Sequence, residues 1–215
     1  MPRTRSIALT ALTMTFFGAG LAFAISIIGG DRPADAVPQS RAPDVPYAPS
    51  DPRVVAEMLA MANVRAEDVV YDLGCGDGRI VIAAVKIRGV RGVCIDIDPE
   101  RIRESEENAR RAGVHGRITF RTQDLFEAEI GDATVVMLFL WPEVNLMLRP
   151  KLLRDLRPGT RIVSHLHDMG AWKPNEIRSV EVDDGDPHYV FSWVMPFGER
   201  TGEWQSAVPR TDTQH

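Results

Sequence analysis

The chain of 215 residues has little cysteine and no excess of basic charge. Its two cysteines, Cys75 and Cys94, are too few for a disulfide scaffold or for a four-cysteine zinc site. Lysine and arginine together number 25, against 30 aspartates and glutamates, and the net charge is −5. Bulk electrostatics therefore give no support for a nucleic-acid partner, which needs a basic face. The composition is otherwise ordinary for a globular protein, which excludes a wholly disordered or collagen-like chain.

The average composition hides two different segments. Residues 1–41 contain four arginines and two aspartates, a net charge of +2, which leaves −7 for the remainder. Residues 6–28 form a run of 23 without a charged side chain, rich in alanine, leucine, isoleucine and phenylalanine. As a helix that rises about 1.5 Å per residue, this run would reach roughly 35 Å, enough to cross a hydrocarbon core of about 30 Å.

Two interpretations of residues 1–30 stay open. A transmembrane anchor, which we prefer, would keep Arg3 and Arg5 in the cytoplasm and place the rest of the chain on the far side of the membrane. A cleaved signal peptide would leave the domain exported to the periplasm, and it fits the small-x-small sites at 22–24 and 34–36. In either case the run is not part of the folded domain.

Proline marks the segment between this run and the domain. Residues 31–50 have prolines at positions 33, 38, 43, 46 and 49, which prevent a helix or a central strand and indicate a linker. The last part of the linker, 45–50, places a tyrosine between prolines and is either a spacer or a stiff segment that docks on the domain. The domain itself is expected over residues 51–197, and residues 198–215 are expected to form a loosely ordered tail.

Strand and helix patterns alternate along the domain. Short apolar runs predict strands at 69–73, 92–97, 118–122, 133–140 and 160–165, and helical patterns begin near 52, 79, 99 and 142. The run 133–140 is continuously apolar, which predicts a central strand that is covered on both faces. Two more strand-like runs follow at 178–182 and 189–195. This order predicts an α/β fold of three layers around a mostly parallel sheet.

A glycine-rich turn, Gly74-Cys75-Gly76-Asp77-Gly78, directly follows the first strand. Three glycines let the backbone approach a ligand closely, but dinucleotide and other nucleotide sites share such turns. Two features are lacking: Arg79 stands where the dinucleotide fingerprint has glycine or alanine, and no Lys-Ser or Lys-Thr follows as in a Walker loop. Because Asp72 and Asp77 would repel a pyrophosphate, the turn favours a cationic ligand that carries a sulfonium and an ammonium.

Two further acids stand at the ends of the next two strands. Asp96 lies 20 residues after Gly76, where a carboxylate accepts both ribose hydroxyls of an adenosine. Asp124 follows the third strand and is placed to accept from the adenine amino group. With Asp72, these acids form a row along a crevice of adenosine size, at the strand ends where open α/β sheets bind their ligands.

The motif Asp72–Gly78, together with Asp96 and Asp124, resembles the class I S-adenosylmethionine-dependent methyltransferases. The resemblance covers about residues 50–197 and implies a Rossmann-like, seven-stranded sheet with an antiparallel last strand. Within that class, Pro46-Tyr47, residues 77–84 and Lys151-Leu152-Leu153 resemble the small membrane-anchored protein-lysine methyltransferases of mitochondria and their bacterial relatives. The expected cofactor, S-adenosyl-L-methionine, would contact Tyr47, Asp72, Gly74, Gly76, Asp77, Gly78, Asp96, Ile97, Asp124 and Leu125.

The acceptor pocket is expected at the ends of the fourth and fifth strands. Trp141 is placed to cover an alkyl-ammonium by cation–π contact, while Glu143 or Asp168 orients the amine. His165 is the fourth candidate catalytic residue, and the same pocket is expected to be lined by Asn145, His167 and Trp172. Strand alternation would send the two histidines the same way, yet they lack a clear third ligand, so no metal is expected.

Several acceptors stay open. No Asn-Pro-Pro-Tyr follows the fourth strand, which lowers the odds of a DNA base or a glutamine amide. We expect methylation of a protein lysine, with a membrane-associated lipid or quinone as the alternative and a non-catalytic exported module as a third interpretation. Cys75 and Cys94 are interpreted as core filler, with a disulfide possible only if the domain faces an oxidising space.

Overall fold

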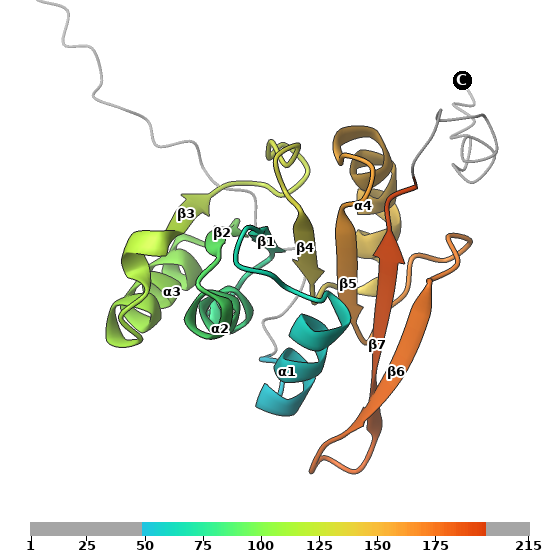
Figure 1. Ribbon diagram of the computed structural model, residues 1–215, viewed down its shortest axis with the longest axis horizontal. Coiled ribbons are helices and arrows are strands. Elements are labelled where there is room, and N and C mark those ends of the chain that lie inside the picture. Colours follow the sequence, from blue (N-terminus) through green and yellow to red (C-terminus); the bar gives the residue numbers. More distant parts are fainter. Residues whose placement is uncertain (1–48, 197–215) are drawn as a thin grey trace, which may run out of the picture. The chain divides into compact units, whose positions relative to one another are not determined.

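The computed structural model describes residues 49–196 (Figure 1). The predicted anchor or signal peptide, all but the end of the predicted linker, Tyr47 and the tail 198–215 lie outside this range. Within the described range no helix is long and apolar enough to cross a membrane. Attachment to a membrane through residues 6–28 therefore stays a prediction from the sequence.

Four α-helices and seven strands make up the domain. The helices are α1 (Pro52–Met61), α2 (Arg79–Arg88), α3 (Pro99–Arg111) and α4 (Pro142–Asp155), with a short 3-10 helix, η1 (His115–Arg117). The strands are β1 (Val69–Leu73), β2 (Arg91–Asp96), β3 (Ile118–Thr122), β4 (Val135–Leu138), β5 (Arg161–His165), β6 (Glu176–Glu181) and β7 (Pro187–Val194). They form one sheet in the order β3-β2-β1-β4-β5-β7-β6.

The direction of the strands agrees with the sequence prediction. Strands β1 to β5 pair in parallel, and β7 runs antiparallel to both of its neighbours, β5 and β6. The α/β fold with a mostly parallel, seven-stranded sheet and an antiparallel last strand is confirmed. Because β7 runs backwards, its first residues and the β6–β7 turn lie at the edge where β1, β4 and β5 end, the lower edge in Figure 1.

Side-chain alternation divides the core between the two faces of the sheet. Helices α1, α2 and α3 pack on one face, against residues such as Val70, Cys94 and Val163. Helix α4 packs on the other face, where Tyr71, Val136 and Trp193 are buried. Since consecutive residues of β1 serve opposite cores, every residue of this strand is buried, as expected for a central strand in a three-layer fold.

Aspartate caps begin two of the helices at the predicted positions, near residues 52 and 99. Asp51 caps α1 and Asp98 caps α3, each by accepting from the backbone N–H two residues on, and proline holds the first position of both helices. The fourth strand differs from its prediction: β4 covers only four residues, 135–138, and not 133–140. The apolar run continues because residues before and after the strand are also buried, not because they pair in the sheet.

Candidate active site

The glycine turn lies between β1 and α2, directly after the end of β1. Gly74, Gly76 and Gly78 all have positive φ, between +53° and +78°, a region that side chains rarely adopt. A Cβ on Gly78 would lie 2.9 Å from the Cβ of Ser105 on α3. Glycine is therefore required here both by the backbone conformation and by the close approach of α2 and α3.

Asp72 is held inside the turn rather than at its surface. Its side chain is 1% exposed, and one carboxylate oxygen accepts from the backbone N–H of Val81 at 3.3 Å. Burial raises the pKa of Asp72 to about 7, against the lowering effect of that hydrogen bond, and the charges of Asp96 and Asp77 act in the same direction as burial. The carboxylate thus fastens the start of α2 to the end of β1.

Asp96 ends β2 beside the glycine turn. One of its carboxylate oxygens accepts from the N–H of Gly76 at 2.9 Å, and the other accepts from the N–H of Asp98 at 3.0 Å. Burial raises the pKa of Asp96, while these backbone hydrogen bonds oppose the shift. A carboxylate has about four acceptor positions, so both oxygens keep room for further donors such as hydroxyls.

Asp77 is paired with Arg79 across the turn. The guanidinium donates to the Asp77 carboxylate at 2.7 Å and, through Nη1, to the carbonyl oxygen of Ser50 at 2.8 Å. No sequence pattern indicated this contact, because Arg79 departs from the nucleotide motifs and Ser50 is 29 residues away. Arg79 therefore links the glycine turn to the segment before α1 and offsets much of the charge of Asp77.

Cys75 and Cys94 form a disulfide, with their Cα atoms 5.4 Å apart. Their interpretation as core filler is wrong. Cys75 lies in the glycine turn and Cys94 lies in β2, so the bond ties the turn to the neighbouring strand across a sequence separation of 19. Both residues are buried among the apolar residues of the α1–α3 face, which explains why the apolar environment alone suggested filler.

The third acid of the predicted row follows β3. Asp124 accepts from the N–H of Phe126 at 2.8 Å and so shapes its own turn. Leu125 is half-buried against the apolar core on the α4 face, and Ile97 is half-buried directly after Asp96. Because β3, β2 and β1 are neighbours in the sheet, Asp124, Asp96 and Asp72 do stand at adjacent strand ends.

On the acceptor side, three predicted residues surround the start of α4. Trp141 immediately precedes α4 and is 51% exposed, and Glu143 is exposed in the first turn of the helix. Asp168 is exposed and accepts from the N–H of Gly170 at 2.9 Å. Burial lowers the pKa of His167, and the carboxylates of Glu143 and Asp168 oppose this shift, which places all three side chains in one neighbourhood.

His165, the fourth candidate, is buried, whereas the other three are exposed. It is the last residue of β5, because Leu166 has a φ of +68° and the strand ends there, and His167 follows in a half-buried position. Burial lowers the pKa of His165 to about 4, and His188 and His167 act in the same direction. Its ring nitrogens contact Ser50 and His188, neither of which the sequence pattern had singled out.

Two other expected pocket residues have structural positions. Asn145 is buried in α4, and its amide donates to Ser164 Oγ and to the carbonyl of His167, both at 3.1 Å, which pins the turn after β5. Trp172 is 4% exposed and packs with Trp193 in the core. Among the residues from 49 to 196, no group of three His, Cys, Asp or Glu side chains could hold a metal ion.

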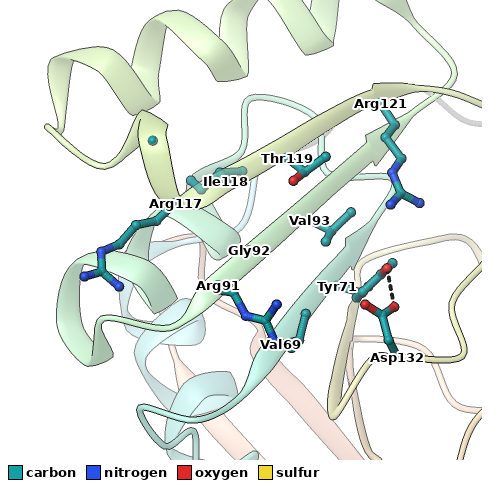
Figure 2. A pocket seen from close by; sticks show the side chains of 11 residues that line it. Val69, Tyr71, Arg91, Gly92, Val93, Arg117, Ile118, Thr119, Arg121 and Asp132 are labelled. Atoms are coloured by element: carbon teal, nitrogen blue, oxygen red, sulfur yellow. Dashed lines mark hydrogen bonds between the residues drawn. The ribbon is translucent and has the colours of Figure 1, made fainter.

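Two hollows lie on the α4 face of the sheet, toward the start of the strands. The first, of about 290 Å³, is lined by Arg91 and Arg121 beside Tyr71, whose hydroxyl donates to Asp132 at 2.5 Å (Figure 2). The second, of about 600 Å³, shares Tyr71, Arg121 and Asp132. Neither is lined by a residue of the glycine turn or of the acid row.

The sequence and the fold were compared with known proteins. Residues 72–176 match the ANTKMT methyltransferase domain. A protein-lysine N-methyltransferase of Saccharolobus islandicus is 46% identical over 158 residues, which are 73% of this chain and 97% of that protein. A crystal structure of an RNA methyltransferase from Salinibacter ruber, in complex with S-adenosyl-L-homocysteine, is 47% identical with a TM-score of 0.66, covering 72% of this chain and 97% of that one.

The chain belongs to the class I S-adenosylmethionine-dependent methyltransferases. Its cofactor is S-adenosylmethionine, as the complex of the Salinibacter protein with the demethylated cofactor supports. A more distant relative, the adenine nucleotide translocase lysine N-methyltransferase of Mus musculus, is 32% identical over 130 residues, which are 60% of this chain and 56% of the mouse protein. This methyltransferase therefore shares the catalytic domain with lysine-specific enzymes but spans only part of the mouse relative.

The residues of the glycine turn and of the acid row fit this cofactor. Asp96 keeps free acceptor positions for ribose hydroxyls, and its carboxylate already orients the N–H of Gly76. Several carboxylates and one guanidinium, which is paired with Asp77, surround the turn. This excess of negative charge suits a sulfonium and an ammonium better than a pyrophosphate. Sequence reasoning missed four residues near this site, Ser50, Arg79, Asp184 and His188, whose positions arise from contacts between distant segments.

Proposed function

We propose that this methyltransferase N-methylates a lysine side chain of a protein. The observation that carries the proposal is an acidic rim, five exposed carboxylates at the end of the sheet where β4, β5 and β7 meet: Glu143, Asp168, Asp183, Asp184 and Asp186. Trp141 is exposed within this region and offers an aromatic face to an alkyl-ammonium. Arg53 pairs with Asp183, but the rim keeps an excess of negative charge, which attracts a protein segment of the opposite sign and raises its rate of encounter.

The proposed cofactor contacts follow the geometry of the crevice. Asp96 would accept the ribose hydroxyls, Asp124 would face the adenine edge, and the glycine turn would lie along the amino-acid moiety. When bound, S-adenosylmethionine supplies an electrophilic methyl group on a cationic sulfur. Ile97 and Leu125 flank the acids from half-buried positions and would provide apolar contact for the adenine ring.

The residues at the start of α4 and after β5 would contact the acceptor lysine and not the cofactor. Trp141 would cover the lysine side chain, and Glu143 and Asp168 would accept hydrogen bonds from its nitrogen and align it. A protonated lysine cannot attack, so the site must also remove a proton, and an ordinary lysine has a pKa of about 10.4. Alignment together with proton removal accounts for methyl transfer without a covalent intermediate.

The names of the relatives point to two acceptor classes, protein lysine and RNA. The acidic rim and the net charge of −5 favour the lysine, because a phosphate backbone requires a basic surface. The same rim gives no advantage to a lipid or a quinone. The similarity to lysine methyltransferases from Saccharolobus islandicus and mouse supports the same choice.

A labelling experiment separates these acceptors. The full chain is incubated with methyl-labelled S-adenosylmethionine and an extract of cells that encode it, and the extract is divided into protein, lipid and RNA. We expect label in protein, recovered as methyl-lysine after hydrolysis, and we expect Asp96→Asn to abolish it. Label that enters the organic phase, or that ribonuclease releases, would refute the lysine proposal in favour of the corresponding acceptor.

A further inference from the structure

A chain of hydrogen bonds runs from the interior of the domain to its surface. Ser50 Oγ lies 3.0 Å from His165 Nδ1, His165 Nε2 lies 2.8 Å from His188 Nδ1, and His188 Nε2 lies 2.8 Å from an Asp184 carboxylate oxygen. Ser50 and His165 are buried, His188 is partly buried and Asp184 is exposed. We call these four residues the Ser50–Asp184 chain.

The carboxylate at the outer end fixes the direction of every hydrogen bond. The bond from His188 lowers the pKa of Asp184, which is therefore an ionised group that only accepts. A neutral imidazole has one N–H, so His188 uses Nε2–H toward Asp184 and its Nδ1 accepts from His165. His165 Nδ1 must then accept from the Ser50 hydroxyl. The lone pairs of Ser50 Oγ stay available to a further donor.

The inner end of the Ser50–Asp184 chain lies between the cofactor side and the acceptor side. The carbonyl of Ser50 accepts from Arg79, whose guanidinium holds Asp77 of the glycine turn. The ring of Phe139, the residue that follows β4, lies against His165 with the centroids 4.1 Å apart. Ser50 is thus fixed near the ends of β4 and β5, where the methyl group and its acceptor must meet.

We propose that the Ser50–Asp184 chain removes the proton from the lysine ammonium, an inference that rests on the lysine activity proposed above. Ser50 is the residue that touches the amine, and His165, His188 and Asp184 are positioning residues that act through it. An ammonium N–H bond breaks, and its electron pair remains on the amine nitrogen. The proton joins Ser50 Oγ, the Ser50 proton moves to His165 Nδ1, and the His165 Nε2 proton moves to His188 Nδ1.

The positive charge then rests on His188, next to the carboxylate of Asp184. After the product leaves, the same transfers in reverse return one proton through Ser50 to water in the emptied site. Each of the three hydrogen bonds exists before and after the transfer, so no buried group loses its partner. Charge is conserved, since one proton enters the chain and one leaves it in each cycle.

The outer histidine, rather than the inner one, is suited to hold the proton. Burial disfavours an imidazolium at His165, and it would lie closest to the cationic sulfur of the cofactor. His188 is near two carboxylates, those of Asp184 and Asp51. The other charged groups around the pair are His167 after β5, and Arg53, which bridges Asp51 and Asp183.

The first test reads the two histidines directly, with no need for activity. Long-range proton–nitrogen spectra of the full chain, labelled with ¹⁵N-histidine, identify which nitrogen carries the proton. At about pH 8 we expect His165 and His188 both as Nε2–H tautomers. On acidification His188 should become the imidazolium, while His165 stays neutral and changes to the Nδ1–H form. Protonation of His165 first, or an unchanged His165 tautomer, would overturn the proposal.

The second test compares variants in the methyl-lysine assay over a range of pH. His188→Asn keeps an acceptor for His165 but cannot hold a proton, and Ser50→Ala removes the inner end. For both we expect a loss of about 100-fold at neutral pH, within the usual contribution of a general base, that shrinks as the pH approaches about 10, where lysine is neutral without help. A loss that is constant with pH would mean a structural role and refute the proposal.

Two controls complete the design. Glu181→Gln removes one exposed carboxylate at the end of β6, outside both the acidic rim and the Ser50–Asp184 chain, so its rate should match the parent enzyme. Binding of S-adenosylmethionine, measured by calorimetry, should be unchanged in His188→Asn. If the parent enzyme labels another residue type, the proposed lysine activity is refuted. The tautomer spectra then still decide whether the Ser50–Asp184 chain carries a proton as described.

Discussion

The buried carboxylate of Asp72 makes the stability of the domain depend on pH in a direction opposite to that of most acids. Its pKa is about 7 in the folded protein, because burial disfavours the charged form, against 3.8 as the ordinary value. The folded state therefore keeps a proton between about pH 4 and pH 7 that the unfolded state has lost. The contribution of Asp72 to the free energy of unfolding is fully present below about pH 4 and is lost as the pH rises through 7.

The substitution Asp72→Asn isolates this effect. A difference of roughly three pKa units corresponds to about 4 kcal/mol, at about 1.4 kcal/mol per unit. An asparagine retains a carbonyl oxygen that can accept from the N–H of Val81, and it has no charge to bury at any pH. The free energy of unfolding of the variant, relative to the parent protein, should therefore rise by about 4 kcal/mol between about pH 4 and pH 8.

Urea denaturation of both proteins at several pH values measures this difference. Titrating groups that do not act on Asp72, such as His165, contribute equally to the two proteins and cancel in the comparison. Asp186→Asn, an exposed substitution of the same type, is the control for the exchange of a carboxylate for an amide. If the difference for Asp72→Asn did not vary with pH, Asp72 would be ionised throughout in the folded protein, and the argument from burial would be wrong.

Four other expected outcomes concern the cofactor, the disulfide, the glycine turn and the acceptor. Binding of S-adenosylmethionine at about pH 6 should release more protons than binding of S-adenosylhomocysteine, which calorimetry in two buffers detects, because a cation favours ionisation of Asp72. Reduction of the Cys75–Cys94 disulfide should lower the free energy of unfolding by about 3 kcal/mol, as urea titrations with and without reductant would show. Gly78→Ala should cost about 2 kcal/mol, since its φ is +78°, again measured by denaturation. Trp141→Ala should reduce kcat/KM for the protein acceptor about tenfold and leave the affinity for the cofactor unchanged. If the affinity for the cofactor fell as much as kcat/KM, the proposed role of Trp141 would be contradicted.

Local patterns predicted the fold and the acid row well. Strand ends and helix starts are governed by neighbouring residues, such as Asp98 and the proline after it, so they can be recognised from the sequence. The row at Asp72, Asp96 and Asp124 was predictable for a further reason. Parallel strands that are joined by helices end at the same edge, so residues in equivalent positions of consecutive strands must converge.

Contacts between distant segments were beyond the sequence. Ser50 meets His165 across 115 positions, and His188 reaches the same ring only because β7 runs back beside β5. The expected alternation of His165 and His167 along one strand also could not be checked from the sequence. Leu166 adopts a positive φ that leucine rarely has, and the strand ends before His167. The disulfide was missed because burial of Cys75 fits both an apolar filler, which the sequence favoured, and a covalent bond.

The acids at and beside the glycine turn have two roles, to fix the turn and to bind the ligand. The net charge of −7 outside residues 1–41 does not distinguish between these roles. Asp72 holds the N–H of Val81 and Asp77 holds Arg79, so both are engaged in fixing the glycine turn before any ligand arrives. A turn that is already ordered loses less conformational entropy on binding. We expect selectivity for a cation over a pyrophosphate to depend mainly on Asp96, which keeps free acceptor positions, and on buried carboxylates that a positive ligand returns to their ionised form. On this expectation, the preference for S-adenosylmethionine arises from where the carboxylates are held, not from how many the chain contains.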